Sequence, residues 1–95
     1  MQLGKIVGTV VSTQKNKSMD GLTLQMVRYL NDSCEPIDTF IVAVDTVGAG
    51  VGEIVLVATG SAARMTPVTE GKPVDGTIVA IVDVLESGGK TRYTK

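Results

Sequence analysis

Five short apolar runs, separated by turn residues, limit what this chain can fold into. They span residues 3–13, 22–30, 38–47, 53–59 and 76–85. The runs are rich in Val, Ile and Leu, and no segment keeps the three-to-four-residue periodicity of an amphipathic helix. Between runs the chain carries turn signals such as Asp-Gly at 20–21 and Pro36, which should end the pairing of its strand. This pattern predicts an all-β fold.

Two further segments complete the predicted fold. Residues 61–64 place a serine before two alanines, which predicts one short helical turn capped by the serine. The pair 88–89 is Gly-Gly and predicts a tight turn into a C-terminal hairpin or tail over residues 90–95. With 95 residues and no linker or internal repeat, the sequence predicts a single domain over 1–95. The predicted architecture is a small five-stranded OB-like barrel.

Three of the runs are apolar at successive positions, and therefore on both faces of the strand. In the third run Phe40 and Val42 alternate with Ile41 and Ala43, and residues 54–58 and 78–85 behave alike. A small antiparallel barrel buries only its inward face, so the outward side chains need a cover. Another copy of the chain is the simplest cover, and the helical turn and tail could cover part of the surface. The pattern predicts self-association.

The amino-acid composition argues against most classes of enzyme and of ligand-binding protein. The chain has no histidine and one cysteine, Cys34, so it lacks the usual base for a serine nucleophile, a transition-metal ligand set and a disulfide. Its formal net charge is −1 and its aromatic residues are Tyr29, Phe40 and Tyr93, which do not make a basic stacking groove for nucleic acid. We therefore expect no enzyme activity, no cofactor, no metal and no nucleic-acid partner.

The sequence shows neither a secretory signal nor a membrane-spanning stretch. The N-terminus lacks the basic and long apolar regions of a signal peptide, and the longest uncharged stretch is too short to cross a bilayer. We expect a cytoplasmic protein with no membrane partner.

A glycine-rich segment between the third and fourth runs is the first candidate site. Its members of interest are Gly48, Ala49, Gly50, Gly52 and Glu53. A phosphate-binding loop needs a helix after it, or a Lys-Ser/Thr pair, and here a predicted strand follows. The stronger interpretation is structural, because glycine supplies positive φ and lets backbones approach closely at a subunit junction or symmetry axis.

The second candidate site is the predicted helical turn and its flank. It consists of Gly60, Ser61, Ala62, Ala63 and Arg64. Without a base near the serine, we interpret Arg64 as a guanidinium that pairs with a carboxylate across an interface. The candidate ion-pair carboxylates are Asp45, Asp75 and Asp83. Asp83 stands between two valines, where an unpaired buried charge would be costly.

Several of these motifs, in this order, resemble one known family. Residues 7–15, 44–53, 60–64, 73–75 and 81–83 are together similar to the pentameric vertex proteins of bacterial microcompartment shells, the ethanolamine-utilisation and carboxysome group. The resemblance implies a homo-pentamer with a narrow axial pore. It also implies that such rings cap the vertices of a polyhedral shell and close a lattice of hexameric shell proteins. The two candidate sites would then line subunit junctions, the pore or the edge facing hexamers.

Two other functions stay open at this point. The fold would also suit a small OB-fold binding module for a metabolite or single-stranded nucleic acid. An anion-binding regulator that uses the glycine-rich segment is a third interpretation.

Overall fold

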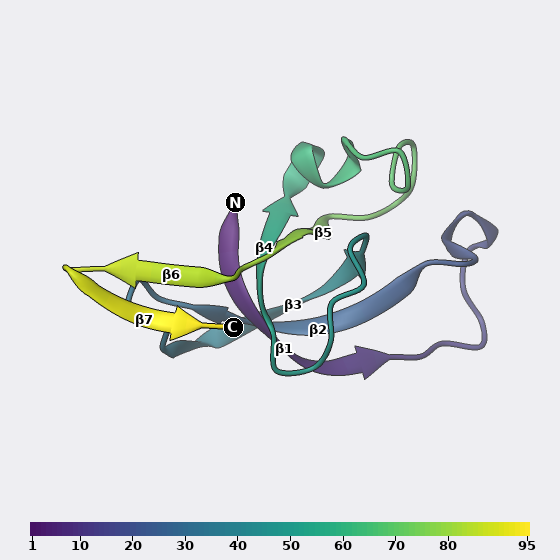
Figure 1. Cartoon of the computed structure of the whole chain (residues 1–95). Helices are drawn as coiled ribbons and strands as arrows, with labels where there is room; N and C mark the ends of the chain where they lie inside the picture. The colour runs from purple at the N-terminus through teal and green to yellow at the C-terminus, as the bar shows by residue number, and fades with distance from the viewer.

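Five strands close into a barrel in the computed structural model, which describes residues 1–95 (Figure 1). The barrel strands are β1 (Gln2–Val10), β2 (Thr23–Leu30), β3 (Pro36–Asp45), β4 (Ile54–Thr59) and β5 (Gly76–Ile81). A separate two-stranded sheet follows, β6 (Val84–Ser87) with β7 (Lys90–Thr94), and two 3-10 turns are η1 (Lys17–Met19) and η2 (Gly60–Arg64). The predicted all-β class, the five-stranded barrel, the helical turn and the C-terminal hairpin are confirmed.

The strand order around the barrel is β1-β2-β3-β5-β4, and all neighbours are antiparallel except β3 and β5. The parallel pair is short, joining Val44 to Thr77 and Asp45 to Ile78. β1 closes the barrel by pairing with both β2 and β4. At Gly4 the closure is so tight that a Cβ would overlap Cγ1 of Val27 on β2.

The barrel interior is filled by small and β-branched side chains. The core cluster consists of Ile6, Val27, Ala43, Ala49, Val55, Val57 and Ile78. Its members come from every barrel strand and from the loop before β4. A narrow barrel with few aromatic residues is the packing that the sequence composition allows.

The segment from η2 to β5 covers part of the outer barrel surface. Ala63 of η2 is buried, and its carbonyl accepts a 2.6 Å hydrogen bond from the buried Thr77 hydroxyl of β5. Thr69 and Ala58 are also buried, so β4 is buried on both faces at this end. For this strand the alternative to self-association is confirmed: the helical turn of the same chain covers apolar side chains that face outward.

Four local predictions are wrong. The first strand ends at Val10 and not at residue 13, and the apolar run 76–85 divides into β5 and β6 at residues 82–83. Pro36 does not stop pairing but begins β3 opposite Leu30, a position where the missing N–H costs nothing. Thr59 and not Ser61 precedes the helical turn, and its side chain makes no cap hydrogen bond.

The β6–β7 hairpin lies outside the barrel and gives the subunit an elongated outline of 46 × 23 × 22 Å. Figure 1 shows it projecting on one side of the barrel, with the loop that carries η1 on the opposite side. The hairpin is anchored by the buried Leu85 and by the Ser87 hydroxyl donating to the Asp32 carbonyl, and the Lys95 N–H donating to the Asp83 carbonyl at 2.8 Å joins its two strands at their base.

Candidate functional site

The carboxylate of Asp45 organises the glycine-rich loop between β3 and β4. One oxygen accepts the backbone N–H groups of Val47 and Gly48 at 3.0 Å each, and the other accepts that of Ala49 at 2.8 Å. The buried Gln25 amide donates to the Ala49 carbonyl at 3.0 Å. These bonds fold the loop inward and hold Ala49 in the end of the barrel core.

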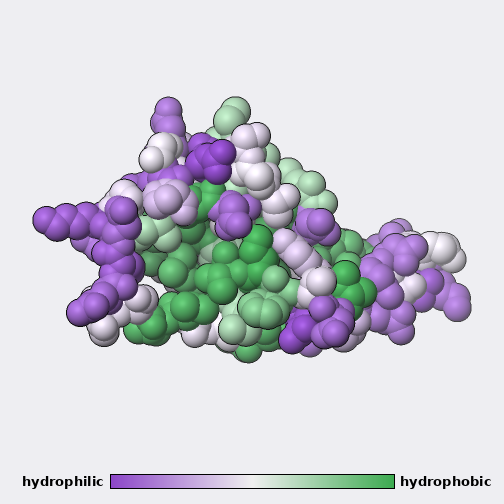
Figure 2. All heavy atoms as spheres, turned by 180° about the vertical axis from the view of Figure 1, so that it is seen from behind, coloured by the Kyte–Doolittle hydropathy of each residue, from purple (hydrophilic) through white to green (hydrophobic).

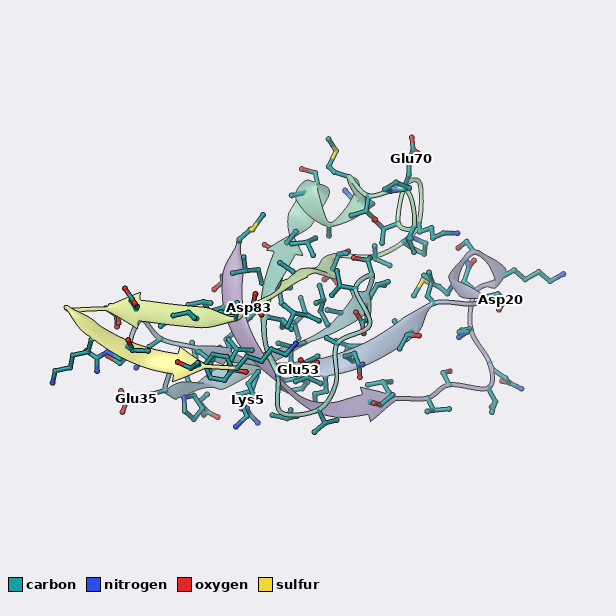
Figure 3. The ribbon with its side chains drawn as sticks, in the orientation of Figure 1. Lys5, Asp20, Glu35, Glu53, Glu70 and Asp83 are labelled. Atoms are coloured by element: carbon teal, nitrogen blue, oxygen red, sulfur yellow. The ribbon has the colours of Figure 1, made fainter.

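Glu53 closes the far end of the same loop. It accepts the Gly50 N–H at 2.6 Å and forms an ion pair with Lys95 at 3.0 Å. The Gly50 hydrogen bond, and after it the bond from Lys95, holds the pKa of Glu53 below its ordinary value, while Glu53 raises the pKa of Lys95. The C-terminal residue is thereby tied to the glycine-rich loop, as Figure 3 shows for the labelled Glu53 beside the end of the chain.

Most backbone N–H groups of this loop are already occupied. Asp45 takes those of residues 47–49, Glu53 takes that of Gly50, and the Gly52 N–H donates to the Ile6 carbonyl at 2.8 Å. A phosphate loop needs these donors free, so the anion-binding interpretation of the loop is wrong. The glycines serve conformation instead: Gly48 and Gly52 have φ of 72° and 92°.

The second candidate segment, at η2, presents a different surface. Ser61, Ala62 and Arg64 are exposed, whereas Ala63 is buried. Arg64 donates from Nη1 to the Val74 carbonyl at 3.0 Å, so within the subunit its partner is a backbone oxygen. The predicted pairing of Arg64 with a carboxylate of a neighbouring chain stays a prediction.

The three candidate carboxylates have separate surroundings. Asp45 is the loop organiser described above, and Asp75 and Asp83 are exposed. The concern that Asp83 is a buried unpaired charge is therefore removed. Asp75 lies near Tyr29, whose pKa is raised by burial first and by the charge of Asp75 second.

The two candidate segments do not form one site. The glycine-rich loop precedes β4 and the η2 turn follows it, so they lie at opposite ends of that strand. Six extended residues separate them by about 20 Å. In a subunit of this shape, the two segments can meet two different neighbours or two different parts of one neighbour.

Exposed apolar side chains form a third surface, on the outer side of β3. Phe40 is 53% exposed and Val42 is 38% exposed, and Ile37 near the start of the strand is exposed as well. The guanidinium of Arg28 lies 5.8 Å from the centre of the Phe40 ring. Figure 2 shows apolar side chains gathered over the middle of the face opposite to that of Figure 1, between hydrophilic ends. The two-faced apolar pattern of the third run predicted this exposure.

The structure lacks two further kinds of feature. No group of three or more His, Cys, Asp or Glu side chains is placed to hold a metal ion. The structure has no helix with the length and apolar content needed to pass through a membrane.

Comparison with known proteins gives a consistent result along the whole chain. The model of the family described as "Ethanolamine utilisation protein EutN/carboxysome" matches residues 1–83. The carboxysome shell vertex protein CcmL of Synechocystis sp. is 42% identical over 95 residues, which are 100% of this chain and 95% of the relative. The microcompartment shell vertex protein GrpN of Rhodospirillum rubrum is 47% identical over 87 residues, covering 92% and 98%.

Solved structures agree with the sequence relatives. A carboxysome subunit, CcmL, superposes with a TM-score of 0.96 at 42% identity and covers 100% of this chain and 99% of that chain. The structure described as the "GrpN pentameric microcompartment shell protein from Rhodospirillum rubrum" gives a TM-score of 0.81 at 47% identity over 92% and 98%.

These similarities exceed what a shared barrel fold alone would give, because identity stays near 40% over the full chain. Family members are structural shell vertex proteins and not enzymes, so the predicted structural role is confirmed. The chain belongs to the EutN/carboxysome family of bacterial microcompartment shell vertex proteins.

Proposed function

We propose that this chain forms a homo-pentamer that caps the vertices of a microcompartment shell and meets hexameric shell proteins along its rim. The observation that carries the proposal is the similarity to the GrpN structure, which is described as pentameric and matches 92% of this chain at 47% identity. The remaining support comes from the exposed surfaces of the subunit.

The apolar surface of β3 favours association. Phe40 and Val42 expose about half and more than a third of their side chains to solvent. Burying the exposed part of one such aromatic side chain stabilises a contact by roughly 1 kcal/mol. In a ring every subunit gains this contribution once, so the effect recurs at each junction.

Ring closure needs two different patches on each subunit. A head-to-tail contact closes into a ring only when patch and complementary patch are related by the right rotation. The glycine-rich loop, with Gly48 to Glu53, and the η2 turn, with Gly60 to Arg64, lie at opposite ends of β4 and suit this requirement. We assign these segments to the subunit junction, the axial pore and the rim. A pentagon among hexagonal tiles bends a flat lattice, which gives the ring its role in closing a shell.

The oligomeric state tests the proposal directly. Native mass spectrometry of the purified protein should report five copies of the 9.9 kDa chain. Phe40→Lys should shift the population toward smaller species, because it places a charge in an apolar contact. Val11→Lys is the matched control, since Val11 is 86% exposed and lies outside the strands. A stable monomer at micromolar concentration in the wild-type protein contradicts the proposal.

The vertex role needs a second measurement. A strain that lacks the gene should form elongated or leaky shells while the enclosed enzymes stay active in extracts. Electron microscopy of the shells, with leakage of an enclosed intermediate, checks this. Closed and intact polyhedra in such a strain, with no second vertex gene, would remove the capping role even if the ring forms.

A further inference from the structure

A cavity of about 510 Å³ lies between the barrel and the β6–β7 hairpin. β1 and β2 contribute Lys5 and Arg28 to its lining, and β7 contributes Arg92 and Tyr93. Figure 3 shows the labelled Lys5 on the side of the barrel where the hairpin ends. Its volume falls within the roughly 300–1,000 Å³ range of small-molecule sites. Because the lining residues are far apart in the sequence, the cavity exists only when the hairpin packs against the barrel.

The lining of this cavity is cationic. Three of its ten residues are Lys or Arg, and none is Asp or Glu. The chain as a whole has a formal net charge of −1, so positively charged side chains are enriched in the cavity lining relative to the whole chain. Of the two ion pairs in the structure, neither involves Lys5 or Arg92. The cavity therefore holds positive charge that the subunit itself leaves largely unneutralised.

The two guanidinium groups keep donors available. Arg92 uses Nε to donate to the Ser87 carbonyl at 3.2 Å, which fixes the side chain and leaves its Nη groups for a ligand. Arg28 approaches Asp38 only at 3.7 Å, beyond hydrogen-bond distance, and the Asp38 side chain is fully exposed. A guanidinium fork matches the geometry of a phosphate or carboxylate group.

The rest of the lining is apolar. Leu30 and Ile54 are 8% and 3% exposed, and they line the same cavity beside the Tyr93 ring. We propose that this cavity binds a small organic anion: Lys5, Arg28 and Arg92 hold its phosphate or carboxylate group, and its apolar part rests on Leu30 and Ile54.

This site adjoins the proposed subunit contact, because the Arg28 guanidinium in its lining lies 5.8 Å from the centre of the Phe40 ring, but anion binding and oligomeric state are measured separately. Gly52 of the glycine-rich loop also lines the cavity, but the proposed anion donors are side chains, since the Gly48 and Gly50 N–H groups are taken by Asp45 and Glu53.

The test is a titration of the purified, assembled protein followed by backbone amide NMR at constant ionic strength. The probes are phenyl phosphate, benzoate, inorganic phosphate and, as a neutral control, phenol. We expect saturable shifts around the cavity for phenyl phosphate or benzoate, with inorganic phosphate weaker because it lacks the apolar part, and none for phenol. The proposal is overturned if binding does not saturate up to about 10 mM probe. A Kd of that size corresponds to a binding free energy of only about −2.7 kcal/mol. If a neighbouring subunit fills the cavity in the ring, the probes cannot bind, and this result also overturns the proposal.

Paired charge variants separate a built site from general attraction of anions. Lys5→Gln should weaken binding of the preferred probe about tenfold, the value of one charge-assisted hydrogen bond. The side chain has no ion-pair partner in the structure, so the fold should be unaffected, as circular dichroism would show. Lys90→Gln removes an equal charge from an exposed position on β7 outside the cavity and should leave binding unchanged. Equal weakening by both variants overturns the proposal.

Discussion

Removing the Asp45 carboxylate should release the glycine-rich loop from the end of the barrel. In Asp45→Ala three backbone N–H groups lose their acceptor. Those of Val47 and Gly48 are exposed and regain hydrogen bonds to water, at a cost of about 0.5 kcal/mol each. That of Ala49, a residue only 6% exposed, loses a bond to a charged acceptor, which costs about 2 kcal/mol. The expected destabilisation is therefore about 3 kcal/mol.

Thermal unfolding by circular dichroism measures this effect. For a domain of 95 residues, about 3 kcal/mol lowers Tm by roughly 12–24 °C. All variants are compared at one protein concentration, because assembly makes Tm depend on concentration. Asp45→Asn should fall between wild type and Asp45→Ala, since its carbonyl oxygen can keep the bonds of Val47 and Gly48 while its amide group cannot accept the N–H of Ala49.

A matched control on the same strand shows whether the loop bonds are responsible. Asp38 lies on β3 as well, is fully exposed and makes only a 3.7 Å contact with Arg28. Asp38→Ala should change stability by less than about 1 kcal/mol, as for other surface ion pairs. If Asp45→Ala melts within about 2 °C of Asp38→Ala, the loop is held by other contacts and the reasoning fails.

Gly4→Ala should destabilise the subunit by about 1–3 kcal/mol, because the new Cβ overlaps the core residue Val27. Gly8→Ala is the control and should be tolerated, since its Cβ would meet open space. Denaturant unfolding measures the stability of both variants. The Glu53–Lys95 contact should stay formed between the ordinary pKa values of 4.5 and 10.5. It should be lost as pH falls through the lowered pKa of Glu53, and as pH rises through the raised pKa of Lys95. The side-chain carbon shifts of Glu53 and Lys95 follow this in NMR, and loss of the low-pH change at the Lys95 side chain in Glu53→Gln is the expected control result. Gly50→Val should leave the subunit folded, since Gly50 lacks positive φ and an added Cβ would meet only a Glu53 oxygen at 3.5 Å. The same variant should reduce the fraction of pentamer in native mass spectrometry. An unchanged pentamer would mean that the loop is an ordinary turn.

Features set by neighbouring residues were predictable from the sequence. Strand positions follow from alternation and turn residues, and the helical turn at η2 follows from its small residues. The role of Asp45 carried a local signal that was missed: an Asp followed three residues later by Gly is typical of a side chain that accepts N–H groups of its own turn. The signal was interpreted as an ion-pair candidate because a strand end offers both roles.

Features set by distant residues were not predictable. The run 76–85 is apolar throughout, and only the position of the barrel edge decides that it leaves the barrel at residues 82–83. The pairing of Glu53 with Lys95 joins the middle of the chain to its last residue, and no local pattern marks either partner. The cavity beneath the hairpin is missed for the same reason, since its lining comes from β1, β2 and β7.

The distribution of cover over the barrel explains why this subunit suits a ring. Where η2 crosses the end of β4, the chain covers its own outward apolar side chains, as the buried Ala58 and Ala63 show. Along the middle of β3 the outward Phe40 and Val42 stay exposed, and on this face only Val44, near the end of the strand, is buried. A chain that covers one side of its barrel and leaves another open has one apolar patch, and in the proposed ring this patch meets a different patch of the next copy. Head-to-tail contacts of this kind close into a ring when the rotation between copies is right, whereas the same patch meeting itself would give a symmetric dimer.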